Sequence, residues 1–599
     1  MWRVIILSGY SLRNNIGAIL FGWCALFREF CMQKKNYPLY ETTKFENFRV
    51  MIENVAEKYP DRVAFAYKED PSKTESRRTY REVRDHVCEI GTELICRGWR
   101  DRTVALIGEA SYEWICSYFA LMAIGAIVIP IDRDMPARDI ADIMNTTEVY
   151  AVHYSSAIEE KISSIREKVP TLMHLICLGT PLIDDAVPVS LIAIEGAKRR
   201  AGGDNAYYDY TIDVDRMATI VFTSGTTGQG KGVMLSQRNI VLDMTNGMYL
   251  FAISPKTINF LPPHHTFCST VIFVGHFSQG STVYLSSGLR YIASEIREQQ
   301  PTHLVLVPLF LEKLNARIWQ TAEKQGKARM LRRMMKLSNA LRHIGIDLRR
   351  TLFKSVHASF GGKLEMVICG GAALNQSVID TFDAIGITIL NGYGITECAP
   401  LVSCNRNRLQ KDGSVGIPII DEEVRIDNPD MNGEGEICVK GPNVMLGYYK
   451  DPEATAKALD ADGYFHTGDY GRIDSERWLF ITGRLKNLII LSNGKNVYPE
   501  EIETEICRLD TVEEVIVYAG ESRSNKKREV IVAEICPNKE AIEKHGIADV
   551  QRYFEDQIKR INKENVSYKA VNMVRIREEE FPKNTSKKIV RFRIDKSID

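Results

Sequence analysis

The chain has 599 residues, 45% of them hydrophobic and 26% charged, and its 77 lysines and arginines balance 77 aspartates and glutamates. This composition is typical of a globular protein of several domain-sized units, and the balanced charge argues against a nucleic-acid partner. The 13 cysteines contain no C-x-x-C pair, which indicates a cytoplasmic location rather than a disulfide framework or a zinc site.

Residues 1–31 form an apolar N-terminal extension, with its longest apolar run from Ile16 to Phe27. A dozen residues are too few to span a bilayer as a helix, and no small-residue cleavage site follows them. Two interpretations stay open. The segment is an interfacial helix that gives a peripheral membrane contact, or it lies upstream of a true start at Met32.

From about Phe45 onward, apolar runs alternate with helical patterns, which indicates an α/β fold. Buried strands are predicted at 104–107, 126–129, 304–307 and 366–369. Several of these runs end in turns that contain glycine or proline. Ligands of parallel sheets gather beyond such strand ends, so we expect a binding site there.

A further apolar run, 218–222, leads into a loop rich in glycine and hydroxyl groups, and Lys231 follows it. Glycine N–H groups, hydroxyls and a lysine together favour binding of a polyphosphate. Gly225, Gly230 and Lys231 also fit the spacing of a Walker P-loop, but that motif needs Ser or Thr next and Gly232 follows instead. An ordinary glycine-rich turn is the remaining alternative.

The segment 324–363 is rich in lysine and arginine and poor in acidic residues. Met330, Met334, Leu337 and Leu341 recur in it at helical spacing. The pattern fits an amphipathic helix that touches anionic lipid, and equally a surface helix packed on the core of its own domain.

Further polar and glycine-containing blocks come later in the chain: Gly370–Leu374, Asn391–Glu397, Gly463–Asp469, Ser492–Glu503 and Pro582–Arg591. The first follows the predicted strand 366–369 and the second another apolar run. Tyr393 offers a face for stacking on a base, and Glu397 a hard oxygen ligand for Mg²⁺. Asp469 is suited to accept ribose hydroxyls, and the planar fork of Arg484 to hold a ribose or a phosphate.

In this order, from about residue 45 to 593, the blocks resemble the adenylate-forming superfamily, which contains acyl-CoA synthetases, luciferases and peptide-synthetase adenylation domains. The resemblance implies an α/β fold with a large multi-lobed N-terminal domain of parallel sheets, residues 32–483, and a small mobile α+β C-terminal domain, residues 484–599. Two positions depart from the family pattern: Gly230 stands where proline is usual, and Lys587 where glycine is common.

The resemblance also assigns roles to residues. It implies Mg²⁺ ligation by Thr223 and Glu397, and a hinge at Lys486. It makes Lys588 the catalytic lysine and His265 a residue of the acyl pocket, although a packing role for His265 stays open. The remaining implied nucleotide contacts lie in the phosphate loop (Ser224, Gly225, Thr226, Thr227, Gly228, Lys231), at the adenine (Gly371, Ala372, Asn391, Gly392, Tyr393), at a phosphate (Thr396) and at the ribose (Asp469, Arg484), with Gly494 facing the thiol acceptor; Thr226 and Glu397 also count as catalytic.

By this resemblance the protein uses ATP and Mg²⁺ to convert a fatty acid into acyl-AMP, and then transfers the acyl group to coenzyme A. The segment 307–314 and the basic insertion look like long-chain acyl-CoA synthetases, while medium-chain and aryl acids stay open. Acyl carrier protein is the alternative acceptor, and a non-catalytic nucleotide-binding relative is the alternative of another class.

Overall fold

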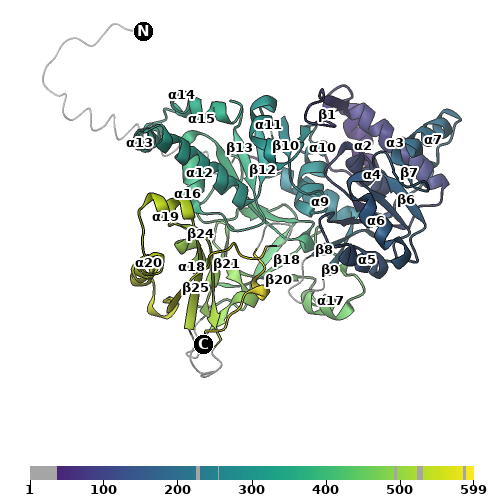
Figure 1. The fold of residues 1–599 in the computed structure, drawn as a ribbon. Coiled ribbons are helices and arrows are strands. Elements are labelled where there is room, and N and C mark those ends of the chain that lie inside the picture. Colours follow the sequence, from purple (N-terminus) through teal and green to yellow (C-terminus); the bar gives the residue numbers. More distant parts are fainter. Residues whose placement is uncertain are drawn as a thin grey trace, which may run out of the picture.

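The structure is a computed structural model that describes residues 37–223, 230–253, 255–491, 496–521, 530–583 and 589–598. Its large N-terminal part contains several mixed sheets, and a smaller sheet region follows at the C-terminal end (Figure 1). The α/β class predicted from the alternating pattern is confirmed.

An eight-stranded sheet has the order β19-β9-β8-β4-β3-β5-β6-β7. Its strands β8, β4, β3, β5, β6 and β7 run parallel, while β9 and β19 add an antiparallel edge. The strands are β3 (Thr103–Ile107), β4 (Ile127–Ile131), β5 (Ala151–Tyr154), β6 (His174–Cys177), β7 (Val187–Pro188), β8 (Met217–Thr223), β9 (Lys231–Ser236) and β19 (Gly447–Tyr448).

Helices cover both faces of this sheet. Side chains alternate between the two faces of a strand, so those of β3 pack into two different hydrophobic clusters. Val104 and Leu106 join the larger cluster, and Ala105 and Ile107 the other. The larger cluster includes α2 (Phe48–Lys58), α3 (Tyr80–Cys96), α4 (Tyr112–Ala123), α7 (Val189–Ala201), α8 (Ala206–Asp209) and α9 (Gln237–Met248), and the other α5 (Ala137–Thr146) and α6 (Glu159–Ile165).

A second sheet, of order β12-β13-β14-β15-β16, carries the other half of the cleft described below. Its first three strands are parallel and its last two antiparallel. The strands are β12 (His303–Leu306), β13 (Met366–Cys369), β14 (Thr388–Gly394), β15 (Leu401–Cys404) and β16 (Ile417–Pro418), and the helices α12 (Pro308–Lys324), α13 (Ala328–His343), α14 (Arg349–Leu352), α15 (Lys354–Ser359) and α16 (Gln376–Ile385).

Two four-stranded sheets complete the large part. One is built from β10 (Lys256–Asn259), β11 (Thr282–Leu285), β1 (Val63–Tyr67) and β2 (Ser76–Thr79), near the π-helix η4 (Phe267–Gly275), α10 (His276–Ser278) and α11 (Ile292–Gln299). The other is built from β17 (Glu423–Asp427), β18 (Gly435–Lys440), β20 (Phe465–Ile473) and β21 (Leu479–Arg484), next to α17 (Pro452–Ala458).

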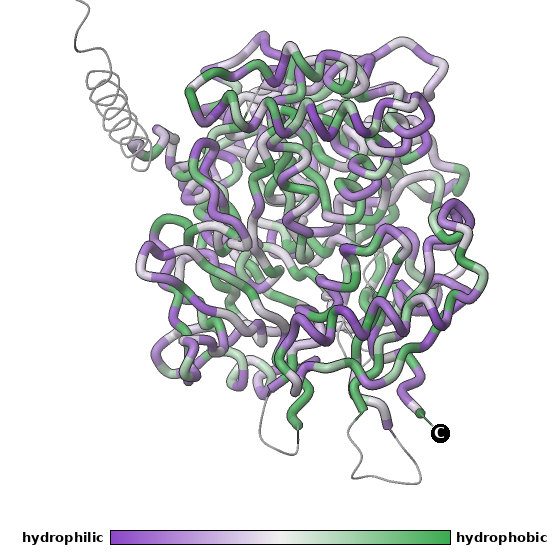
Figure 2. The backbone as a smooth tube through the Cα atoms, turned by 90° about the vertical axis from the view of Figure 1, so that its left-hand side faces the viewer, coloured by the Kyte–Doolittle hydropathy of each residue, from purple (hydrophilic) through white to green (hydrophobic). Residues whose placement is uncertain are grey.

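The C-terminal part has hydrophobic clusters of its own, formed only by residues from Ile489 onward. It consists of β22 (Ile489–Ile490), β23 (Asn496–Val497), α18 (Pro499–Ile506), β24 (Val512–Gly520), β25 (Val530–Pro537), α19 (Lys539–Lys544), α20 (Val550–Glu564) and β26 (Met573–Ile576). In Figure 2 the hydrophobic stretches gather toward the middle of the molecule.

The predicted buried strands lie in β3, β4, β12 and β13, with ends shifted by at most two residues, and the run 218–222 lies in β8. The sheets, however, are mixed rather than purely parallel. Their antiparallel edges come from short returns such as the one from β8 to β9.

The basic segment 324–363 contains α13, α14 and α15, and α13 packs on the core. Leu331 and Ser338 are buried, and Met334 is partly buried against the second sheet's cluster. Met330 and Leu337, by contrast, are 50% and 53% exposed. The interpretation as a surface helix on its own core therefore describes this segment, and lipid contact stays a prediction. Within the described ranges, no helix is both long and apolar enough to cross a membrane.

Candidate functional site

A cleft of about 3580 Å³ brings together every predicted site residue that the structure describes. These residues are Thr223, Lys231, His265, Gly371, Ala372, Asn391, Gly392, Tyr393, Thr396, Glu397, Asp469, Arg484 and Lys486. The remaining predicted residues lie outside the described residues: Ser224, Gly225, Thr226, Thr227, Gly228, Gly494 and Lys588.

The residues converge because strand ends from both large sheets open into the same cleft. Thr223 ends β8, and Gly371 and Ala372 lie two and three residues after the end of β13. Asn391 lies opposite Cys369 in the parallel pair of β13 and β14, so the two strands enter the cleft in register. Crevices beyond the carboxyl ends of strands are the usual ligand sites of α/β sheets.

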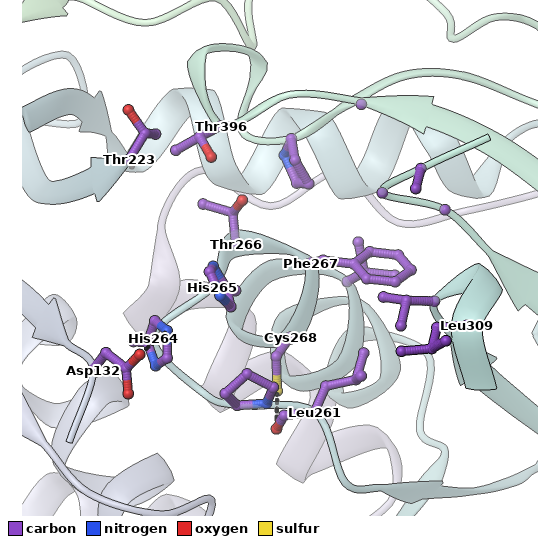
Figure 3. Close-up of a pocket in the computed structure, with 18 of the residues that line it drawn as sticks. Asp132, Thr223, Leu261, His264, His265, Thr266, Phe267, Cys268, Leu309 and Thr396 are labelled. Atoms are coloured by element: carbon purple, nitrogen blue, oxygen red, sulfur yellow. Dashed lines mark hydrogen bonds and ion pairs between the residues drawn. The ribbon is translucent and has the colours of Figure 1, made fainter. Parts of the chain in front are cut away.

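At one end of the cleft, hydroxyl, ammonium and carboxylate groups face each other. Thr223 pairs with Lys231 across β8 and β9, and its Oγ1 donates to the Lys231 carbonyl at 3.4 Å. The Lys231 Nζ stands 4.5 Å from the centroid of the Tyr448 ring. The Tyr448 hydroxyl donates to Glu397 Oε1 at 3.0 Å. Thr223 and Thr396 both line the cleft, and Figure 3 draws their side chains in the same part of it. Carboxylate and hydroxyl oxygens of this kind suit Mg²⁺.

Glu397 sits on a turn, η6 (Thr396–Cys398), that buried groups hold from behind. The amide of Asn443 donates to the carbonyls of Cys398 at 3.1 Å and Leu401 at 2.8 Å. Asp243 Oδ1 accepts from the Leu401 N–H at 2.9 Å. Asn443 and Asp243 are buried, and burial raises the pKa of the Asp243 carboxyl well above its usual value.

Sequence reasoning missed Tyr448, Asn443 and Asp243. Tyr448 ends β19, Asn443 precedes that strand, and Asp243 lies on α9, all more than 40 residues from Glu397 in sequence, and no motif marks them. Their role is visible only once the chain is folded.

At the other end of the polar surface, Asp469 is fixed by two partners. It lies opposite Arg484 in the antiparallel pair of β20 and β21, with Arg484 Nε 2.6 Å from Asp469 Oδ1. The Tyr393 hydroxyl donates to Asp469 Oδ2 at 2.6 Å. Burial, followed by the charge of Asp469, raises the pKa of Tyr393, so its hydroxyl keeps the proton that it donates. The result is an oriented, buried carboxylate suited to accept vicinal hydroxyls.

Between these ends, glycines keep the wall of the cleft open. Gly371 has a φ of +90°, a conformation that a side chain would strain. A Cβ added at Gly392 would meet the Ser403 carbonyl oxygen at 3.3 Å. The Asn391 amide donates to the Ser414 carbonyl at 3.3 Å. Gly371 and Gly392 line the cleft without side chains, so the wall presents backbone at these positions.

His265 stands beside the start of η4, where its carbonyl accepts from the N–H groups of Cys268 and Ser269 at 2.9 Å each. Its ring packs against that of His264, with 4.2 Å between centroids. His264 Nε2 in turn lies 3.6 Å from Asp132 Oδ2, a contact that sequence reasoning missed (Figure 3). Burial lowers the pKa of His264 despite the opposing effect of Asp132.

Beyond His265 the lining becomes apolar. The residues there include Phe260, Leu261, Phe267, Leu309, Phe310 and Leu374. Figure 3 places Phe267 and Leu309 on the side of His265 away from Asp132. One cleft thus joins a polar end to an apolar arm, as expected of a site for an amphipathic ligand.

The C-terminal part also reaches the cleft. Lys486 lies in η7 (Leu485–Asn487), and burial together with Arg484 lowers its pKa against the opposing charge of Asp469. Arg591 and Lys583, from the last block of the sequence, line the cleft too.

Comparison with known proteins agrees with this site. The family model for AMP-binding enzymes matches residues 52–449. Long-chain-fatty-acid–CoA ligase 1 of Cavia porcellus is 29% identical over 497 residues, covering 78% of this chain and 70% of that protein. A chloroplastic long-chain-fatty-acid–acyl-carrier-protein ligase of Arabidopsis thaliana is 28% identical over 562 residues, covering 81% and 75%.

Solved structures share the fold. The anthranilate CoA ligase AuaEII, in complex with anthranoyl-AMP, superposes with a TM-score of 0.72 at 18% identity over 93% of this chain and 97% of that one. The o-succinylbenzoate coenzyme A synthetase of Bacillus subtilis, with ATP and magnesium ion, gives 0.68 at 20% identity over 92% and 99%. The chain belongs to the AMP-binding enzyme family and is an adenylate-forming, acyl-activating enzyme of the AMP-forming acid–thiol ligases.

Proposed function

We propose that the protein activates a long-chain fatty acid with ATP and Mg²⁺ to acyl-AMP and pyrophosphate, and then transfers the acyl group to coenzyme A to give acyl-CoA and AMP. The observation that carries the substrate class is the apolar arm of the cleft, which starts beside His265 and continues past Phe267 to Leu309. An apolar chain bound there has its carboxylate at the polar end.

The chemistry of the first half-reaction explains the groups at the polar end. A carboxylate must attack the α-phosphate of ATP, and both are anions, so positive charge must be concentrated between them. Thr223 and Glu397 would hold Mg²⁺, which would supply part of that charge. Lys231 would hold the leaving pyrophosphate, and Lys588 would stand between the carboxylate and the α-phosphate.

The nucleoside would be held at the other end. Asp469, oriented by Tyr393 and Arg484, would accept the ribose hydroxyls. The wall at Gly371, Ala372, Asn391 and Gly392 would admit the adenine. No side-chain nucleophile is needed, because the thiol of the acceptor displaces AMP in the second half-reaction.

A second acceptor has specific support. The Arabidopsis relative is named as a ligase for acyl carrier protein, and its identity to this chain, 28%, is close to the 29% of the CoA ligase of Cavia porcellus. Acyl carrier protein is therefore the alternative to coenzyme A.

The test is acid-dependent ATP–pyrophosphate exchange by the purified chain, measured across acids from short to long and including aryl acids. We expect exchange to be greatest with long acyl chains. Thioester formation with coenzyme A and with acyl carrier protein is then compared at equal acceptor concentration. Maximal exchange with short or aryl acids would contradict the proposed substrate class. Thioester formation with acyl carrier protein but not with coenzyme A would make acyl carrier protein the acceptor.

A further inference from the structure

Three side chains with metal-binding atoms meet on the sheet next to the cleft, outside the set already described. Glu436, Cys438 and His466 place their ligand atoms within 4.8 Å of one another. His466 Nδ1 lies 2.9 Å from Glu436 Oε2 and 3.4 Å from Cys438 Sγ. The trio contains one nitrogen, one sulfur and one carboxylate oxygen, all of which are ligand types of Zn²⁺.

The backbone fixes this arrangement. Cys438 on β18 lies opposite His466 on β20 in the antiparallel pairing. Glu436 precedes Cys438 by two residues, so both side chains emerge from the same face of β18. The trio is therefore set by sheet register rather than by a chance meeting of loops.

The separation of the nitrogen and sulfur atoms fits a tetrahedral zinc ion. With Zn–S and Zn–N bonds of about 2.3 and 2.0 Å, a zinc ion holds its nitrogen and sulfur ligands about 3.5 Å apart and its nitrogen and oxygen ligands about 3.3 Å apart. The observed Nδ1–Sγ distance of 3.4 Å agrees with this. The Nδ1–Oε2 contact of 2.9 Å would have to open by about 0.4 Å.

The surroundings hold both a carboxylate and a competing cation. Arg425 lies opposite Cys438 on the neighbouring strand, its Nη2 donates to Asp460 Oδ2 at 2.9 Å, and its guanidinium would have to move away from the thiol when a metal ion binds. Asp460 Oδ2 lies 3.6 Å from the other ring nitrogen of His466, Nε2, where a carboxylate commonly orients a metal-binding histidine. The side chains of His466 and Glu436 are 25% and 21% exposed, which leaves water access to a fourth coordination position. Burial, followed by the charges of Glu436 and Asp427, raises the pKa of the Cys438 thiol to about 12. A metal ion that binds there must displace this proton.

We propose that Glu436, Cys438 and His466 form a Zn²⁺ site whose occupancy weakens nucleotide binding. The link to the cleft is short. Glu436 Oε1 accepts from the Gly468 N–H at 3.0 Å, and Gly468, with a φ of +68°, immediately precedes Asp469. The Asp469 N–H donates to Thr467 Oγ1 at 3.0 Å. Movement of the Glu436 carboxylate toward a metal pulls on the turn that presents Asp469; this second part of the inference rests on the proposed nucleotide-binding function.

The first test is titration of the metal-free full-length chain with Co²⁺, which takes zinc sites and reports sulfur ligation through a charge-transfer band in the near ultraviolet. We expect one equivalent to produce the band and Zn²⁺ to abolish it. Cys438→Ser should lose the band, and the exposed-site control Cys507→Ser should keep it. His466→Gln, at a partly exposed position, provides a second loss variant should Cys438→Ser fail to fold. Absence of the band, or its persistence in both loss variants, overturns the site.

The second test measures the Kd of AMP with and without Zn²⁺ in the wild type and in Cys438→Ser. We expect a several-fold weaker Kd with Zn²⁺ in the wild type alone. An unchanged Kd in a chain that shows the cobalt band overturns the coupling. A chain that shows the band but binds no AMP contradicts the proposed function and leaves the metal site standing.

Discussion

Tyr393 and Arg484 both contact the carboxylate of Asp469 and fix its orientation. Arg484 binds mainly one oxygen and Tyr393 the other, and all three side chains come from different strands. A similar arrangement holds Glu397 through Tyr448. Each acidic group thus accepts from a tyrosine that burial keeps protonated, and both acidic residues line the cleft.

Removal of the Tyr393 hydroxyl should weaken nucleotide binding. Tyr393→Phe removes the hydrogen bond of 2.6 Å to Asp469 Oδ2, and the contact of 3.4 Å from Arg484 Nη2 to the same oxygen is much longer. A hydrogen bond to a charged group contributes about 1.5–3 kcal/mol, so we expect the Kd of AMP to rise about tenfold or more. Calorimetric titration with AMP measures this. Tyr448→Phe is the matched control, because its hydroxyl serves Glu397 instead. Equal AMP affinity in Tyr393→Phe and the wild type would show that the tyrosine does not orient the ribose contact.

Glu397→Gln should raise the Mg²⁺ concentration needed for half-maximal pyrophosphate exchange, because an amide is a much poorer ligand for a hard cation than a carboxylate. The neutral side chain still accepts from the Tyr448 hydroxyl, so the fold should be retained. Exchange measured against Mg²⁺ concentration is the readout, with the surface substitution Glu423→Gln as control. The same magnesium requirement in Glu397→Gln and the wild type argues against metal ligation.

The sequence could predict the residues that face the cleft, but not the residues that support them. Thr223, Tyr393, Glu397, Asp469 and Arg484 stand in motifs, and the structure brings them to one cleft. Their supporting partners stand in ordinary segments. In the sequence, Asp243 is an ordinary polar residue of a helix and Tyr448 an ordinary aromatic residue after a glycine. Their supporting role becomes visible only when the folded chain brings them next to Leu401 and Glu397. The loop from Ser224 to Gly228 and Lys588 stay predictions.

At the scale of elements, the turn that carries Glu397 depends on helix α9. Asp243 on α9 and Asn443 before β19 hold the segment from Cys398 to Leu401 through three hydrogen bonds. Asp243 has Glu422, Cys398 and Cys404 as its titratable neighbours. All three thiol or carboxyl groups have raised pKa values, with burial as the main cause.

This cluster predicts a pH-dependent stability. Because the folded-state pKa of Asp243 is raised, the folded state keeps a proton that the unfolded state releases above pH of about 4. The contribution of Asp243 to the free energy of unfolding is therefore fully present below that pH, and it is lost as the pH rises toward the folded-state pKa. Asp243→Asn keeps an acceptor for the Leu401 N–H but does not titrate.

From about pH 5 to 8, the free energy of unfolding should fall more steeply for the wild type than for Asp243→Asn. The slopes of the free energy of unfolding against pH should differ by at most about 1.4 kcal/mol per pH unit. Urea unfolding of both proteins at each pH measures it. Parallel pH profiles would mean that Asp243 is already ionised in the folded protein.

The elements themselves were largely predictable, because buried parallel strands are short apolar runs that end in turns. The antiparallel edges β9, β15 and β16 were not predicted. Strand direction depends on which neighbour a segment meets after folding, and hydropathy does not encode it. For α13 the spacing of Met330, Met334 and Leu337 predicted a helix, but the buried face is centred one position away, at Leu331 and Ser338. Packing against α16 decides that rotation.

At the scale of the whole molecule, the C-terminal part has separate hydrophobic clusters yet lines the same cleft through Lys486, Lys583 and Arg591. We propose that residues 484–599 form a domain that swings about Lys486. One orientation would bring Lys588 to the α-phosphate for adenylation. The other would withdraw it and admit the thiol acceptor beside Gly494.

Lys588→Ala should therefore separate the two half-reactions. We expect acyl-AMP formation to be lost and thioester formation from supplied acyl-AMP to be spared, each followed by product chromatography. Lys587→Ala is the matched control for the neighbouring lysine and should retain both. Equal loss of both half-reactions in Lys588→Ala would contradict a role confined to adenylation.

The most direct test of the central claim is a single-turnover reaction without any thiol acceptor, in which the full chain is mixed with ATP, Mg²⁺ and a long-chain fatty acid and the products are identified by mass spectrometry. The account predicts one equivalent each of acyl-AMP and pyrophosphate per chain. ADP with orthophosphate, or ATP left intact with every acid tried, would contradict it.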